Sequence, residues 1–370
     1  MLLLILGIQI LTGLMLATNY SPEEPLTFVT VDYILRDANY GWIVRALHMG
    51  GASMFFLLIY THVARGVYFG VYLKNPHVWY SGLALYVLSM GVGFLGYVLP
   101  WGVMSYWGLT VISNMMTVIP GGGRTLSWFQ GGFVITSVTL KRVFILHFLL
   151  PFVILGISLA HVVVLHMNGS SNPLGLDETN FMVPFHPYYT IKDLAGFVLL
   201  LAGLVAMTFT FVSLTVDPLQ WQPVNKMKTP SVIKPEWYFL YAYAILRSIP
   251  SKAGGVFTMF AAIVGVVVFP LISSEKLQSM KVCPPARLVF VIWVANFMFL
   301  TVIGSQEPSG GWFFAGQFGT VLHLGALVVI PLVKSSWEWF LFMNVELKED
   351  EKNPRVEKAK EKLNMILSNG

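Results

Sequence analysis

The sequence predicts an all-α integral membrane protein with eight transmembrane helices, of which the first four form a bundle. Two observations support this prediction. Hydrophobic residues make up 56% of the 370 residues and charged residues only 11%, whereas an ordinary soluble protein is about 25% charged. The chain also contains eight long stretches with almost no charge, each close to the roughly 20 residues that cross a bilayer as a helix.

Lack of charge defines each predicted span in turn. Seven of the stretches contain no Asp, Glu, Lys or Arg, and the second contains only Arg45. The first has no basic segment and no small-residue cleavage site, so we expect a span there rather than a cleaved signal peptide. The eight spans are predicted at residues 1–18, 43–62, 79–99, 143–166, 194–213, 255–273, 288–304 and 316–333.

The connections between spans divide the chain further. Because the chain crosses the bilayer at every span, the first, third, fifth and seventh connections lie on one face. The third carries Trp101, Trp107 and Trp128 among apolar residues, which is typical of helices lying on the membrane surface. We therefore expect an N-terminal bundle with its fifth helix at 1–213, a Pro- and aromatic-rich loop at 214–254, three helices at 255–345 and a charged, solvated tail at 346–370.

Charge and cysteine content exclude several classes of function. The formal net charge is only +5, and the 23 Lys and Arg residues lie at span ends and in loops, so we expect no nucleic-acid-binding surface. Cys283 is the single cysteine. It cannot form an intrachain disulfide, a thiolate metal cluster or the two-cysteine attachment site of a c-type haem.

Four of the eight histidines lie inside predicted spans at matched intervals. His48 and His62 in the second span, and His147 and His161 in the fourth, are each 14 residues apart. This spacing places both imidazoles on one helix face, about 21 Å apart along the axis. Since the two spans run in the same direction, His48 would face His147 and His62 would face His161, near opposite membrane surfaces.

An intramembrane histidine indicates a functional site, although a single one more often forms a helix–helix hydrogen bond. Two equal pairs on parallel helices favour the functional interpretation. Zinc prefers three or four clustered protein ligands, which this spacing cannot supply. Two opposed imidazoles suit the axial positions of a haem iron that acts as an electron carrier, so the pattern predicts two haems that carry electrons across the membrane.

Glycines and arginines near the histidines fit this prediction. Gly82 and Gly96 in the third span are also 14 apart, and with Gly13 they would let a flat macrocycle approach the backbone. Ordinary small-residue packing between helices explains each glycine alone equally well. Arg45 and Arg65 lie three residues outside their nearest histidines, where each could pair with a haem propionate or simply extend to the interface.

With these histidines, the sequence resembles the cytochrome b family, the dihaem subunit of respiratory complex III, over nearly its whole length. The resemblance rests also on four motifs: GYVLPWG at 96–102, NGSSNPLG at 168–175, FHPYYTIKD at 185–193 and PEWYFLYAYAILRSIP at 235–250. It implies two b-type haems, with a low-potential haem on His48 and His147 and a high-potential haem on His62 and His161. It further implies a quinol oxidation site beside the first haem and a quinone reduction site beside the second.

Glu236 is the candidate proton acceptor for quinol oxidation. It is a carboxylate in an apolar, aromatic loop at the interface, where burial would raise its pKa and let it take a proton from a quinol hydroxyl. The local sequence alone is equally consistent with an exposed Glu at the start of a short helix that Pro235 begins. The resemblance favours the proton acceptor and assigns Pro235, Tyr243 and Gly108 to the same pocket.

On the opposite face, the end of the fourth span and the start of the fifth carry His166, Ser170, Lys192 and Asp193. The resemblance implies a quinone reduction site here, in which His166 and Asp193 relay protons. The alternative is local: Thr190 and Asp193 would form a helix capping box, and His166 would meet the last carbonyls of its own helix. The three other histidines are expected to be interfacial or packing residues: His77, His186 and His323.

The resemblance implies the catalytic subunit of a ubiquinol–cytochrome c reductase. Its partners would be a Rieske-type iron–sulfur protein, a cytochrome c1-type subunit and the other subunits of a dimeric complex III, in the mitochondrial inner membrane or, alternatively, a bacterial plasma membrane. Two other functions stay open from the residues alone. One is a bis-haem ferric or oxygen reductase, which would need a flavin domain for which 370 residues leave little room; the other is a transporter with histidine proton relays.

Overall fold

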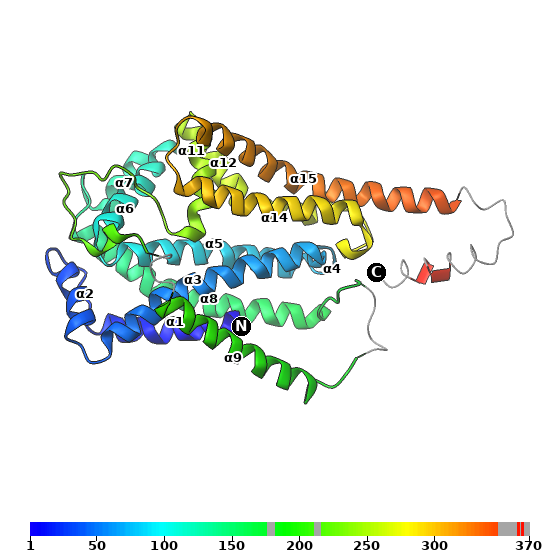
Figure 1. The fold of residues 1–370 in the computed structure, drawn as a ribbon, viewed down its shortest axis with the longest axis horizontal. Helices are drawn as coiled ribbons and strands as arrows, with labels where there is room; N and C mark the ends of the chain where they lie inside the picture. Colours follow the sequence, from blue (N-terminus) through cyan, green and yellow to red (C-terminus); the bar gives the residue numbers. More distant parts are fainter. Residues whose placement is uncertain (176–181, 211–215, 347–360, 363, 366–370) are drawn as a thin grey trace.

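The computed structural model describes residues 1–175, 182–210, 216–346, 361–362 and 364–365 (Figure 1). Within these ranges the chain is helical and contains no named strand; the one isolated β-bridge joins Gly102 and Pro223. The predicted tail at 346–370 lies almost entirely outside the described residues, as does the predicted boundary at 213. The all-α membrane fold predicted from the sequence is confirmed.

In the part of the chain that the structure describes, seven helices are long and apolar enough to cross a membrane, and α1 (Leu2–Ala17) is a shorter apolar helix. Together they correspond one to one with the eight predicted spans. The seven are α3 (Gly41–Tyr68), α5 (Pro76–Val98), α8 (Ser137–Asn168), α9 (Tyr188–Phe209), α12 with α13 (Lys252–Val264 and Phe269–Ile272), α14 (Pro284–Ser305) and α15 (Gly311–Glu346).

Helix ends extend beyond the predicted spans because polar residues continue several helices past their apolar stretch. A capping box between Thr136 and Thr139 begins α8. The start of α9 is at Tyr188, six residues before the predicted start, and its N-cap is Pro187 with no side-chain hydrogen bond. The alternative role of Thr190 and Asp193 as a capping box is therefore wrong, because both residues lie within the helix.

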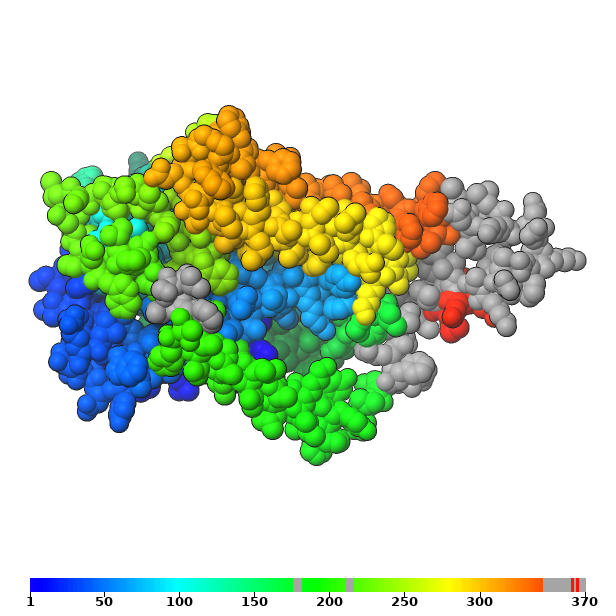
Figure 2. All heavy atoms as spheres, viewed as in Figure 1, coloured from blue at the N-terminus to red at the C-terminus, as the bar shows by residue number. Residues whose placement is uncertain are grey.

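Two groups of helices lie side by side along the long axis of the molecule (Figure 1). In the first, α1 packs on α3, α3 on α9, and α5 on α8; in the second, α14 packs on α15 and α11 (Leu240–Ser248). Figure 2 shows α14 and α15 as one continuous layer in yellow and orange. Apolar side chains such as Leu11, Phe318 and Val321 are more than 60% exposed, as expected for helix faces that contact lipid.

Short helices close one end of the molecule, at the left of Figure 1. They are α2 (Leu26–Arg36), α6 (Val103–Met115) and α7 (Gly122–Gln130). The third connection is therefore helical. At the other end, α4 (Val71–Lys74) follows α3. The largest buried cluster lies where α3, α5, α11, α12 and α14 meet, and includes Phe56, Ile245 and Leu300.

Candidate functional site

The four intramembrane histidines meet as two pairs between α3 and α8. The ring centroids of His48 and His147 lie 6.3 Å apart, and those of His62 and His161 lie 6.5 Å apart. Because imidazole nitrogens bind metals at about 2.0–2.1 Å, rings at this separation can share one metal atom between them. No cluster of three or more His, Cys, Asp or Glu suited to a metal ion occurs among the described residues, so each site offers two protein ligands.

Hydrogen bonds hold three of these rings by their Nδ1 atoms. His48 Nδ1 lies 2.9 Å from Thr12 Oγ1, and that hydroxyl donates its own hydrogen to the carbonyl of Ile8. His161 Nδ1 lies 2.8 Å from Ser81 Oγ, which likewise donates to a carbonyl of its own helix. His147 Nδ1 lies 3.0 Å from the carbonyl of Val92.

These hydrogen-bond partners determine which nitrogen of each imidazole ring carries the hydrogen. A hydroxyl that already donates, or a backbone carbonyl, can only accept, so the Nδ1 atoms of His48, His147 and His161 carry hydrogen and their Nε2 atoms are lone-pair donors. This is the arrangement in which an outer partner orients a metal-binding histidine and increases its basicity. The donor sets therefore fit a haem iron.

Each predicted glycine lies against a histidine ring of a neighbouring helix. A Cβ placed on Gly13 would lie 3.1 Å from Cε1 of His48, and one on Gly82 would lie 3.3 Å from Cε1 of His161. A Cβ on Gly96 would approach Cε1 of His147 to 2.5 Å. The glycines therefore leave space on α1 and α5 at the depth of the histidines, as a flat group held between them requires.

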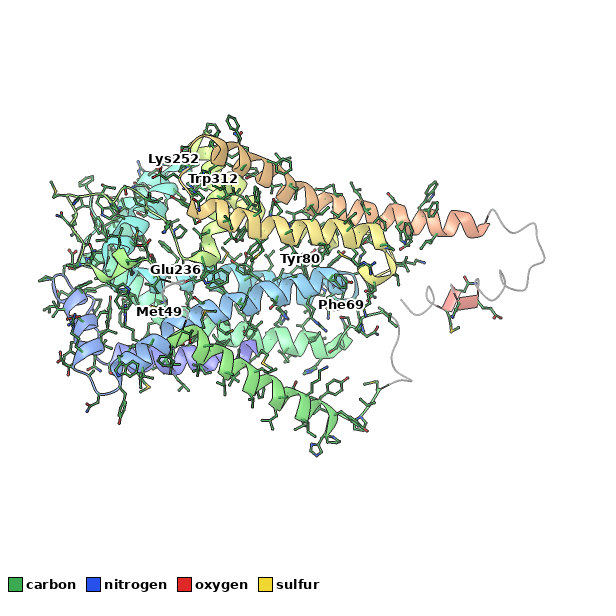
Figure 3. All side chains as sticks on the ribbon, in the orientation of Figure 1. Met49, Phe69, Tyr80, Glu236, Lys252 and Trp312 are labelled. Carbon is green, nitrogen blue, oxygen red and sulfur yellow. The ribbon has the colours of Figure 1, made fainter. Side chains whose placement is uncertain are left out.

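The first histidine pair opens into a cavity of about 250 Å³ that also reaches Glu236. Figure 3 shows Glu236 and Met49, two of its lining residues, near each other towards the left of the view. The cavity is lined mainly by apolar and aromatic side chains from α1, α3, α5 and α8. The predicted site residues in its wall are Gly13, Arg45, His48, Gly96, His147 and Glu236.

Glu236 is half-buried in this wall. It is the N-cap of a short 3₁₀-helix, Trp237–Phe239, that leads into α11. Burial, and to a lesser extent the negative charge of Asp217, raise the pKa of Glu236 to about 8. A carboxyl group with this pKa exchanges protons near neutral pH.

The two arginines differ in position. Arg45 lines the cavity, and its guanidinium lies 4.5 Å from the centroid of the Trp221 ring. Arg65 lies 5.4 Å from the ring of Phe69. Neither arginine forms an ion pair in the described part of the chain, so both can pair with an anionic group.

Three residues assigned to the pocket from the resemblance do not line this cavity. Tyr243 donates to the carbonyl of Ile233 at 2.6 Å, and its ring is covered by Arg247. Gly108 lies in α6, where an added Cβ would meet no neighbouring group within 4 Å. Pro235 precedes Glu236, but it does not line the cavity.

On the opposite face the structure does not bring the predicted reduction-site residues together. His166, Ser170, Lys192 and Asp193 are all exposed or partly exposed, and no hydrogen bond or ion pair among the described residues joins any two of them. The carbonyl of Ser170 accepts from Lys74 at 2.8 Å. Towards this end α8 and α9 diverge (Figure 1), so the two halves of the predicted site lie apart.

Sequence reasoning missed the groups that hold the site. Thr12 directly precedes Gly13, and Ser81 directly precedes Gly82, so a Ser or Thr before these two glycines was an available signal; Gly96 follows Leu95 and offers none. Asp217 was also missed, because nothing in its spacing relates it to Glu236.

Comparisons with known proteins agree with this geometry. Residues 1–169 match the family described as Cytochrome b/b6/petB, and residues 223–324 match Cytochrome b(C-terminal)/b6/petD. Among solved structures, a chain of a "Hyperthermophilic respiratory Complex III" is similar with 31% sequence identity and a TM-score of 0.86. The match covers 90% of this chain and 89% of that chain. The chain therefore belongs to the cytochrome b family and is a cytochrome b of the complex III type.

Proposed function

We propose that this chain carries electrons between two b haems and couples quinol oxidation on the Glu236 face to quinone reduction on the opposite face. The main observation in support of the proposal is that His48, His147 and Glu236 line the same cavity. A site that removes electrons and protons from one molecule needs an electron acceptor and a proton acceptor within reach of it.

The residues present fit two haems. His48 and His147 would hold one and His62 and His161 the other, with Gly13, Gly82 and Gly96 leaving space beside the rings. A bis-histidine haem iron supplies one-electron Fe(III)/Fe(II) chemistry and has no open position for dioxygen. On the cavity side Arg45 would pair with a propionate, and Arg65 would do so on the other side.

Glu236 accepts one of the two protons that quinol releases when it becomes quinone. Phe56 and Tyr238, whose ring centroids are 4.1 Å apart, give the cavity an apolar, aromatic wall beside Glu236. A raised pKa matches the carboxylate to this task, because a base whose pKa is near the working pH can both take up and release the proton. Pro235, Tyr243 and Gly108 would shape the approach to the cavity rather than its wall.

The quinone reduction site on the opposite face stays a prediction. His166 and Asp193 are exposed and can deliver protons from water, and Lys192 and Ser170 can bind the quinone carbonyls. The support is their position on the face of His62 and His161, opposite Glu236.

The partners follow from the same proposal. The described residues hold no cysteine cluster, so one electron of quinol would pass to a Rieske-type iron–sulfur protein and then to a cytochrome c1-type subunit, while the other would pass to the haem of His48 and His147. The assembled, dimeric complex would be a ubiquinol–cytochrome c reductase of a mitochondrial inner membrane or a bacterial plasma membrane.

A reduced-minus-oxidised optical spectrum of the purified complex tests the proposal. We expect two b-type components, of which His48→Leu removes one and His62→Leu removes the other. Addition of quinol should reduce the haems, and Glu236→Gln should slow this reduction about 100-fold with both components retained. A protein without two b components would refute the electron path, and haems that quinol does not reduce would refute the quinol site.

A further inference from the structure

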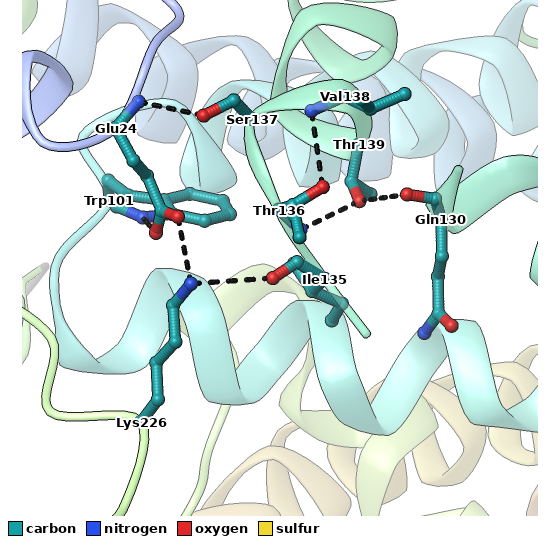
Figure 4. Close-up of polar contacts among 9 residues, drawn as sticks. All are labelled: Glu24, Trp101, Gln130, Ile135, Thr136, Ser137, Val138, Thr139 and Lys226. Atoms are coloured by element: carbon teal, nitrogen blue, oxygen red, sulfur yellow. Dashed lines mark hydrogen bonds and ion pairs between the residues drawn. The ribbon is translucent and has the colours of Figure 1, made fainter. Parts of the chain in front are cut away.

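A carboxylate outside the cavity holds two of its walls together. Glu24 lies in the connection between α1 and α2, and its Oε1 accepts a 2.5 Å hydrogen bond from the indole nitrogen of Trp101 (Figure 4). Its Oε2 pairs with Lys226 Nζ at 2.8 Å. Its backbone amide donates to Ser137 Oγ at 3.0 Å. One residue thus joins segments that lie as far as 202 positions apart in the sequence.

Trp101 is the more constrained partner. It is 3% exposed and has a φ of 58°, in the left-handed region that a residue with a side chain rarely adopts. Such strained residues persist only where their surroundings fix them, and they concentrate at functional sites. The hydrogen bond to Glu24 fixes the indole, and Tyr97, Leu99 and Pro100 shortly before it line the cavity.

Lys226 connects Glu24 to the second wall of the cavity, which is formed by the loop segment that contains Gln220. The residues before it in the loop are joined to the end of α5 and the start of α6. Gln220 Nε2 donates to the carbonyl of Tyr97 in α5 at 3.0 Å, and the amide of Val103, the first residue of α6, donates to the carbonyl of Gln222 at 3.0 Å. Gln220 lines the cavity. The 220–226 segment of the loop therefore lies against the 97–103 segment. One residue of each, Lys226 and Trp101, contacts the carboxylate of Glu24.

We propose that Glu24, through Trp101 and Lys226, is a positioning residue for the Glu236 cavity. Resting on the proposed function, this assignment means that Glu24 sets the shape of the quinol-binding wall without touching quinol. A charge-assisted contact from outside suits this role, because it fixes the 97–103 and 220–226 segments relative to each other and leaves the apolar cavity surface unchanged.

A neighbouring ion pair provides the matched control. Glu23 and Lys141 join the same connection to α8 at 3.2 Å, but both side chains are about half exposed, at 54% and 50%. The Glu24–Lys226 pair is more enclosed, at 23% and 38% exposure, and Glu24 has the additional indole donor. Breaking the exposed pair should change the free energy of unfolding only slightly.

The test uses the intact complex with Glu24→Gln, Lys226→Met, Lys226→Arg and Lys141→Met. We expect Glu24→Gln and Lys226→Met to raise the KM for a soluble quinol about tenfold, with kcat changed less and both haem bands retained. Lys226→Arg should restore the KM of the unaltered protein, and Lys141→Met should not change it. Glu24→Gln and Lys226→Met both break the ion pair between Glu24 and Lys226. The variant that carries both changes should therefore have a KM no higher than that of Glu24→Gln alone.

Hydrogen exchange at the Val103 amide provides a readout that does not depend on quinol chemistry. We expect faster exchange in Glu24→Gln and Lys226→Met and no change in Lys141→Met. Unchanged exchange would refute the connection itself, and faster exchange with an unchanged KM would refute its role for quinol. If the unaltered complex does not oxidise quinol, the proposed function fails, and exchange still decides whether Glu24 holds the two segments.

Discussion

Gly96 of α5 faces His147 of α8 so closely that a Cβ on Gly96 would lie 2.5 Å from the Cε1 atom of His147. Cβ contacts this short do not occur in folded proteins, so a larger residue here must displace the ring or the helix. The position of His147 therefore depends on a residue of another helix that has no side chain.

Gly96→Ala should weaken or remove the b component of the His48/His147 pair and leave the other component in place. The reason is steric, since the added methyl group moves one ligand of the first site and is about 21 Å from the second along the helix axis. Optical spectra with haem quantification measure this. Gly91→Ala is the control in the same helix, because a Cβ there would meet no neighbouring group within 4 Å; equal loss in both variants would contradict the steric explanation.

The histidine pairing shows what the sequence could predict. A spacing of 14 residues in two parallel helices is sufficient to decide which rings face each other, because helix geometry fixes both the face and the depth. Hydropathy likewise predicted where the spans lie. It could not predict the start of α9, because its first turns carry Lys192 and Asp193, and a charge-based criterion excludes them.

Other parts of the site could not be predicted because they depend on contacts distant in the sequence. Thr12 and Ser81 are ordinary polar residues within their helices until the histidines of α3 and α8 are placed beside them. Asp217 influences Glu236 from a distant part of a loop that follows no periodicity. The four residues of the predicted reduction site are near helix ends that diverge, which no motif indicates.

Thr12→Val should raise the reduction potential of the haem held by His48 by about 20–60 mV. The hydroxyl accepts the Nδ1 proton of His48, and this bond increases the basicity of the ligand and stabilises the ferric iron. A neutral hydrogen bond of about 0.5–1.5 kcal/mol corresponds to that range for one electron. Redox titration of the b components measures the potential.

Thr61→Val provides the matched control for this titration. Thr61 is adjacent to His62 in α3, but its exposed hydroxyl donates only to carbonyls of its own helix. Its replacement should leave both potentials unchanged. A shift of the same size in Thr61→Val would show that the titration reports helix packing rather than the bond to His48.

Quinol oxidation should become faster as the pH rises through about 8. Glu236 must be deprotonated to accept a proton, and burial raises its pKa to about 8, so the competent carboxylate is the minor form below that pH and the major form above it. Initial rates of haem reduction by quinol across this range measure the profile. In Glu236→Gln the dependence should disappear together with most of the rate.

Asp217→Asn should move the midpoint of that profile to lower pH. The charge of Asp217 is the second cause of the raised pKa of Glu236, so its removal leaves only the larger effect of burial. Asn keeps the N-cap bond to the amide of Leu219. Lys234→Gln breaks the ion pair with Asp217 but retains the carboxylate, and a downward shift in that variant as well would contradict a direct effect of the Asp217 charge.

Lys334 and Glu275 form a buried ion pair whose loss should destabilise the protein strongly. Their charged atoms lie 2.9 Å apart with side chains 1% and 0% exposed, and Lys334 also donates to Tyr72 at 3.1 Å. Removing one partner leaves an uncompensated buried charge, which costs about 3–5 kcal/mol. Thermal unfolding in detergent should therefore show a much lower midpoint for Lys334→Met or Glu275→Leu alone.

The double variant should recover most of this stability, because two apolar side chains of similar size replace the pair and no charge stays buried. The exposed pair of Arg36 and Asp32, at 74% and 45%, gives the comparison: Asp32→Asn should change the free energy of unfolding by less than about 1 kcal/mol. If the double variant were as unstable as the single ones, Tyr72 and the packing around Lys334 would account for the loss, rather than the unpaired charge.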